Sequence, residues 1–168
     1  MSRLARGLLA VAVLFIVGGC GFRLRGETPL PPGLERPWIE ASAESRIAEP
    51  LRRALTRAGA VPVATPAEAS ALLVLDGENM STEVLSIGGG ARIREFRIRY
   101  RLKLEVRDRG GAPLLAPVQL ELSRDYNFDE RGALGAELEA EQLREELVRD
   151  MLQAVLRHVG AAARSPSP

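Results

Sequence analysis

The stretch from Phe96 to Val106 reads Phe-Arg-Ile-Arg-Tyr-Arg-Leu-Lys-Leu-Glu-Val, an unbroken alternation of apolar and charged residues. Successive side chains of a β-strand point to opposite faces of the sheet, so this period of two puts every apolar group on one face. The pattern is typical of an antiparallel sheet that is covered on one face and solvated on the other. It therefore predicts a strand with an apolar inner face and a basic outer face.

Further strands are expected on both sides of this stretch. Before it, residues 72–75 are continuously apolar, and residues 84–87 are again mostly apolar. They end at Gly88-Gly89-Gly90, which predicts a hairpin turn. After it, residues 108–111 predict a second turn, and alternation resumes over residues 114–122 and continues to Phe128.

Two irregularities are predicted within these strands. Ile93 is out of phase with Phe96, which indicates a bulge near Arg94-Glu95. Pro117 has no N–H to donate to a neighbouring strand, so it favours an edge strand or a bulge at that position.

Two helices and a short first strand complete the pattern. Residues 38–41 predict the strand, and a helix is expected from about Ser45 or a few residues later to Ala58, with Pro50 in its first turns and Gly59 in a left-handed cap. Residues 133–159 predict a long second helix. The expected buried positions are Leu51, Leu55 and Ala58 in the first helix and Ala136, Ala140, Leu143, Leu147, Met151 and Val155 in the second.

The order β-α-β-β-β-α predicts an α+β fold. We expect a two-layer sandwich in which an about four-stranded, mostly antiparallel sheet packs against two helices on one face. That face carries Phe96, Tyr100 and Leu104.

The N-terminus is similar to a bacterial lipoprotein signal peptide. Arg3 and Arg6 precede an apolar run, Leu8 to Val17, and the lipobox Val17-Gly18-Gly19 ends at Cys20, the only cysteine. The apolar run is about half of the ~20 residues that a membrane span requires. The resemblance implies that Cys20 is the first mature residue and carries acyl chains, and that Gly21 after it directs the protein to the outer membrane. The alternative is that Cys20 is a small buried apolar residue.

Four segments follow from these patterns. We expect a signal peptide at 1–19, a lipidated N-terminus and proline-rich tether at 20–37, a single α+β domain at 38–160 and a disordered tail at 161–168. Removing residues 1–19 leaves 149 residues and lowers the formal charge from +1 to −1. A nearly neutral, secreted chain argues against a nucleic-acid partner.

Across nearly all of its mature length the chain resembles the LptE family of LPS-assembly lipoproteins. The resemblance rests on the opening Cys20-Gly21-Phe22-Arg23-Leu24-Arg25-Gly26, the strand from Phe96 to Leu102, the segment from Arg124 to Phe128, and Glu141 to Leu156 with its Met151. It implies a lipoprotein that is anchored in the outer membrane, on the periplasmic side, and that complexes with and plugs the LptD β-barrel. It also implies assistance in lipopolysaccharide assembly into the outer leaflet and binding of lipopolysaccharide. The alternative function is that of a lipid carrier or an auxiliary lipoprotein of an envelope transport system.

Catalytic and metal-binding patterns are not found in the sequence. The single histidine, His158, lies near the end of the second helix, where the helix dipole favours a cation. Glu137, Glu139 and Glu141 read as a solvated first half of that helix rather than an acid pair. We therefore expect a non-enzyme without a cofactor or metal.

One constellation is a candidate binding site, the basic residues in and before the alternating strand, which we call the basic stripe. Outward residues on a strand lie about 6.6–7 Å apart, and guanidinium groups bind phosphate oxygens through two hydrogen bonds. Three interpretations stay open: contacts with lipopolysaccharide, contacts with the barrel wall, or a solvated face whose arginines pair with neighbouring acids such as Glu83 and Glu121. The candidates are Arg92, Arg94, Arg97, Arg99, Arg101 and Lys103.

Overall fold

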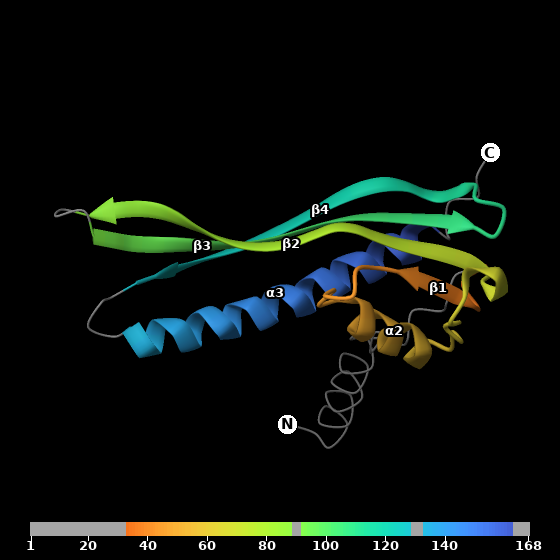
Figure 1. Cartoon of the computed structure of the whole chain (residues 1–168), viewed down its shortest axis with the longest axis horizontal. Helices are drawn as coiled ribbons and strands as arrows, with labels where there is room; N and C mark the ends of the chain where they lie inside the picture. The colour runs from red at the N-terminus through yellow and green to blue at the C-terminus, as the bar shows by residue number, and fades with distance from the viewer. Residues whose placement is uncertain (1–32, 89–91, 129–132, 163–168) are drawn as a thin grey trace, which may run out of the picture.

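The computed structural model of the chain describes residues 33–88, 92–128 and 133–162 (Figure 1). Its strands form one four-stranded sheet in the order β1-β2-β3-β4. β1 lies parallel to β2, and the other neighbours are antiparallel. The predicted α+β fold and the order of its main elements are confirmed. The elements are β1 (Pro37–Glu40), α2 (Ala48–Arg57), the 3-10 turn η1 (Pro66–Glu68), β2 (Ala71–Gly88), β3 (Arg92–Asp108), β4 (Pro113–Asn127) and α3 (Ala133–Ala162).

The molecule is elongated along its strands. β2 has 18 residues and β3 has 17, and at about 3.3 Å per residue each strand reaches roughly 55 Å. β1 pairs only with Ala71–Val74, at one end of β2. α3 runs along the inner face of the sheet, whereas β1 and α2 lie at one end (Figure 1).

The core lies between the sheet and the helices, as the alternation on β3 predicts. Five inward side chains of β3 are fully buried, and α2 and α3 supply the facing layer. Removing each large aliphatic side chain from water stabilises the fold by about 1.5–3 kcal/mol. The fully buried residues include Ile98, Tyr100, Leu102, Leu104 and Val106 of β3, Leu51 of α2, and Leu147, Met151 and Val155 of α3.

Both predicted irregularities are confirmed by the strand register. Ser86 pairs with Glu95 and Ile87 pairs with Ile93, so Arg94 has no partner on β2. β4 is an edge strand, and its register with β3 shifts beside Pro117.

A third irregularity, in β2, was not predicted. The register shifts between Asp76 and Asn79, and Gly77 adopts φ +60° there. Glycine tolerates this left-handed conformation, which an L side chain rarely adopts. The extra residue shifts β2 from an odd to an even inward phase, so that Leu75 and Met80 both contact the core.

The bulge places the carboxylate of Glu78 at the junction of three segments. Glu78 accepts hydrogen bonds from the Ser45 hydroxyl, the Arg46 backbone N–H at 2.9 Å and the Tyr100 hydroxyl at 2.6 Å. Ser45 Oγ also accepts a hydrogen bond from the Ala48 N–H at 3.1 Å, in the first turn of α2. Burial and the neighbouring carboxylate raise the pKa of Tyr100.

The ends of the elements differ slightly from expectation. α2 begins at Ala48, a few residues after Ser45 as predicted, and Gly59 has φ +94° after the helix, also as predicted. Leu34 is 3% exposed, so folded structure begins before residue 38. α3 continues to Ala162, past residue 160. Packing of Leu34 against the core extends the domain into the segment expected to be tether.

The substitution Tyr100→Phe removes one hydrogen bond to the half-buried carboxylate of Glu78 without opening a cavity. We expect a loss of about 1–2 kcal/mol in the free energy of unfolding, measured by urea denaturation. Tyr126→Phe is the control, because among the described residues its hydroxyl has no hydrogen-bond partner. Equal losses in both variants would contradict the role given to Glu78.

The raised pKa of Tyr100 also predicts a pH dependence. The folded state keeps this proton above the unfolded pKa of about 10, so the stabilisation is complete below about pH 10 and declines as the pH rises. Denaturation between neutral pH and pH 11 should show a steeper alkaline loss in the wild type than in Tyr100→Phe. Tyr126, whose pKa is also raised, is present in both proteins. Its contribution therefore cancels when the two pH profiles are compared. Parallel pH profiles would refute the prediction.

Candidate functional site

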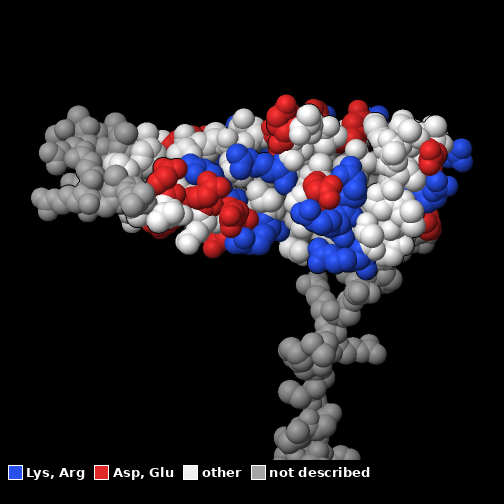
Figure 2. Space-filling view, turned by 60° about the horizontal axis from the view of Figure 1, so that its bottom comes forward, with Lys and Arg blue, Asp and Glu red and all other residues white. Residues whose placement is uncertain are grey.

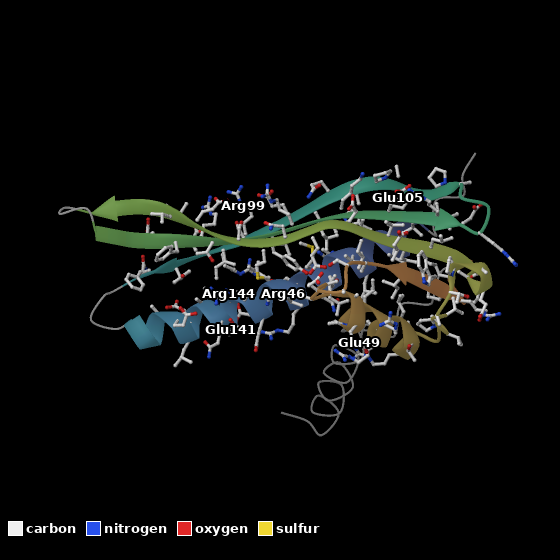
Figure 3. All side chains as sticks on the ribbon, in the orientation of Figure 1. Arg46, Glu49, Arg99, Glu105, Glu141 and Arg144 are labelled. Carbon is white, nitrogen blue, oxygen red and sulfur yellow. The ribbon has the colours of Figure 1, made fainter. Side chains whose placement is uncertain are left out.

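The outward side chains of β3 form a row of charges between β2 and β4. Arg99 and Glu105 point away from the helices in Figure 3. The strand register sets Arg97 between Glu83 and Asp125, because Glu83 lies opposite it on β2 and Asp125 opposite it on β4. The side chains of Arg92 and Arg94 lie outside the described part of the chain.

Arg97 is bound by a carboxylate through two hydrogen bonds. Its Nε and Nη2 donate to the two oxygens of Asp125 at 2.7 and 2.8 Å. The pKa of Asp125 is lowered by these bonds, and the pKa of Arg97 is raised by them. The Nε/Nη2 edge of this guanidinium is therefore occupied.

Arg99 lies between two acids from the neighbouring strands. Its Nη2 is 3.0 Å from Glu83, and its Nε is 3.5 Å from Glu121, where it is not aligned for a hydrogen bond. One of the three open interpretations was a solvated face whose arginines pair with acids such as Glu83 and Glu121. Arg99 is paired in this way in the structure. Both acids share a face with Arg99, since the strands are in register.

Arg101 and Lys103 differ from Arg97 and Arg99 in their ion pairing. Within residues 33–88, 92–128 and 133–162, neither has a carboxylate oxygen within ion-pair distance. The register sets Arg101 between Asn79 and Glu121, and it sets Lys103 between Asp76 and Gln119. Beyond them, Arg107 and Glu105 form a pair at 2.7 Å. The stripe therefore presents two cations that retain their hydrogen-bonding capacity.

A depression of about 350 Å³ lies beside Lys103, where β1 ends. Charged groups line it from β1, β2 and β3, including Glu40, Asp76, Glu105 and Arg107. Sequence reasoning missed this feature, because it depends on the parallel pairing of β1 with β2. Its lining suits a polar group more than an acyl chain.

The segment from Arg124 to Phe128 connects β4 to the helix side of the sheet. Arg124 forms an ion pair with Asp150 of α3, which ties the edge strand to the helix layer. On the helix side, the rings of Tyr126 and Phe96 stack with centroids 5.4 Å apart, and Phe128 meets Phe96 edge-on at 5.6 Å. This aromatic cluster covers the inner face near the end of the β2–β3 hairpin, where Val84 is 46% exposed.

Two kinds of feature are absent from the described residues, and the lipidation signal lies outside them. No described helix is long and apolar enough to cross a membrane. No described group of three or more histidine, aspartate or glutamate side chains could hold a metal ion. The lipobox Val17-Gly18-Gly19 and Cys20 lie outside the described residues.

Relatives support the resemblance drawn from the sequence. The chain is 28% identical over 153 residues to the LPS-assembly lipoprotein LptE of Yersinia enterocolitica, covering 89% of this chain and 72% of the relative. It is 30% identical over 155 residues to the protein of that name from Yersinia pestis, covering 90% and 73%.

Solved structures share the fold. Lipoprotein B from Nitrosomonas europaea, solved by NMR, is 29% identical and superposes with a TM-score of 0.72 over 84% of this chain and 91% of its own. The rare lipoprotein B from Shewanella oneidensis, at 20% identity and a TM-score of 0.64, covers 75% and 94% and shows the fold alone. The family model LptE, described as Lipopolysaccharide-assembly, matches residues 32–159. Since this match spans most of the 168 residues, the chain belongs to the LptE family.

Proposed function

We propose that this protein is an outer-membrane lipoprotein, anchored through acyl chains on Cys20, that acts without catalysis in lipopolysaccharide assembly. Its partner is an LptD-type β-barrel, whose lumen it occupies from the periplasmic side. The observation that carries the proposal is the family match over residues 32–159. The signal-like N-terminus, with its cysteine after two glycines, supports the anchor.

The dimensions of the domain support the plug role. Four strands at about 4.8 Å spacing give a sheet about 19 Å wide, with a helix layer about 10 Å away. A small barrel is filled by its own side chains, so only a large barrel could admit this cross-section. The lumen of an outer-membrane barrel is polar, and the outer sheet face presents the ion pairs of Arg97 and Arg99.

Lipopolysaccharide binding is assigned to the part of the stripe that retains free donors. Arg101 and Lys103 are two residues apart on one face, about 6.6–7 Å along the strand. That spacing lets them contact separate phosphate oxygens of lipid A. Arg97 would first have to release Asp125, to which it makes two hydrogen bonds. We therefore place the contact at Arg101 and Lys103 and give Arg97 and Arg99 a role in ordering the face.

The carrier alternative finds less support in this structure. A lipid carrier encloses acyl chains in a largely apolar cavity. Here the space between the layers is filled by buried side chains such as Tyr100, Leu147 and Met151. The depression beside Lys103 is lined by charged groups and is too polar for acyl chains.

The double variant Arg101→Gln/Lys103→Gln should bind fluorescent lipopolysaccharide about tenfold more weakly than the wild type, because two charge-assisted contacts are lost. Affinity would be measured at several salt concentrations, with thermal melting to verify folding. The matched control is Arg109→Gln/Arg157→Gln, which removes the same charge from exposed positions elsewhere. Unchanged affinity in the folded double variant would reject the assignment.

Lipidation should matter for assembly with the barrel. Tagged protein purified from outer membranes in detergent should retain a stoichiometric LptD-type barrel, identified by mass spectrometry. Cys20→Ala, at low expression, should lower that yield because the protein is no longer concentrated at the membrane. An inner-membrane transporter as the stable partner, or no partner at all, would favour the auxiliary role instead.

A further inference from the structure

The outward face of α2 carries a cluster of arginines that the functions above do not use. Leu51 and Leu55 are buried, and the opposite side of the helix presents Glu49 and three arginines. We refer to these three as the α2 basic patch. In Figure 2 basic side chains gather around an acidic one on the face over α2. The patch consists of Arg52, Arg53 and Arg57.

The patch has more cations than its own acid can neutralise. Glu49 lies 2.6 Å from Arg52 and 3.5 Å from Arg53, so one carboxylate serves two guanidinium groups. Among the described residues, Arg57 donates only to the Arg53 carbonyl, at 3.4 Å. The side chains of Arg52 and Arg53 are 45% and 64% exposed. These donors face solvent and suit phosphate oxygens.

The domain begins beside the C-terminal end of α2. The Val61 N–H donates to the Glu35 carbonyl at 2.8 Å, and the Ala60 N–H donates to the Leu55 carbonyl at 3.0 Å. These bonds join the first described residues to the turn that follows Arg57. Val61 itself is 65% exposed. An exposed apolar side chain thus follows the basic patch by four residues, beside the start of the described domain.

The tether is short enough to keep this end of the domain close to the anchor. Thirteen peptide steps separate Cys20 from Gly33, and even a fully extended backbone of that length spans at most about 45 Å. A short tether gives the attached patch an effective concentration in the millimolar range at the membrane. Weak electrostatic contacts are then sufficient to hold it there.

We propose that the α2 basic patch contacts anionic phospholipid headgroups in the leaflet that holds the acyl chains of Cys20. The proposal rests on the lipid anchor of the proposed function. Each arginine near an anionic surface strengthens binding about fivefold, and Val61 adds a small apolar contact. Because α2 and the outer sheet face lie on opposite sides of the molecule (Figure 1), this contact turns Arg101 and Lys103 away from the bilayer. The stripe stays accessible before the protein meets its barrel.

A label on α2 tests the contact in the lipidated, mature protein. Cys20 is the only cysteine, and lipidation would consume its thiol, so Thr56→Cys provides a unique attachment point for a fluorophore beside the patch. Ser123→Cys provides a matched point on the outer sheet face. Both proteins are reconstituted in vesicles that contain a headgroup quencher, made of phosphatidylcholine alone or mixed with phosphatidylglycerol. Neither lipopolysaccharide nor the barrel is present.

We expect stronger quenching at position 56 in the phosphatidylglycerol vesicles, reversed by high salt, and little change at position 123. Replacing Arg52, Arg53 and Arg57 with glutamine should abolish the difference. Replacing Arg101, Lys103 and Arg109 with glutamine removes the same charge from positions outside the patch and should preserve the difference. Glutamine is chosen because it suits a helix and adds no repulsion of Glu49.

Several results would overturn the inference. One is equal quenching of position 56 in both vesicle types, and another is a difference that survives loss of the patch arginines. A third is protection of position 56 only after a barrel partner is added, which would identify the patch as a protein interface. A protein that floats with neither vesicle type would instead show that the anchor at Cys20 fails. That outcome removes the basis of the inference and is distinct from a failure of the patch.

Discussion

The carboxylate of Glu78 joins three parts of the chain that are distant in sequence. It accepts hydrogen bonds from Ser45 and Arg46 ahead of α2 and from Tyr100 in the middle of β3. A half-buried carboxylate is costly unless donors surround it, so these bonds constrain the bulge, the start of α2 and the position of Tyr100 together. The bulge in turn sets the phase of β2. Without the left-handed Gly77, the residues beyond it would turn their apolar side chains to solvent, because a shift of one residue reverses every side chain.

The alternation of apolar and charged residues on β3 gives the sheet a buried inner face and a charged outer face. The inner side chains of β3 are buried in a core that both helices share. On the outer face, Asp125, Glu83 and Glu121 pair with Arg97 and Arg99. Such exposed pairs add little stability, yet they make the face polar and hold its side chains in order. The positions of Arg101 and Lys103, rather than the total charge of the face, then distinguish the proposed lipopolysaccharide contact.

Opposite sides of the molecule thus carry separate groups of cations. The outer sheet face presents Arg101 and Lys103, and α2 presents its basic patch beside the start of the domain. In the proposed arrangement an N-terminal tether holds the protein near its leaflet, so the face next to the start of the domain meets lipid first. One group of cations then orients the protein at the bilayer, while the other stays available for the proposed lipopolysaccharide contact.

The sequence by itself determined the architecture and the family. Strict alternation on β3, the phase break at Ile93, Pro117 and Gly59 each report a local backbone requirement, and each was confirmed. Tertiary structure alone decided the pairing of charges. Whether Arg99 binds a ligand or Glu83 depends on strand register, which side-chain alternation leaves open along the strand. The role of Glu78 likewise could not be predicted from the sequence. A glutamate in a strand is expected to face solvent unless a bulge turns its side chain inward. The α2 patch became a candidate site once the Glu35–Val61 hydrogen bond placed the start of the described domain beside the end of α2, because proximity between distant segments is a property of packing.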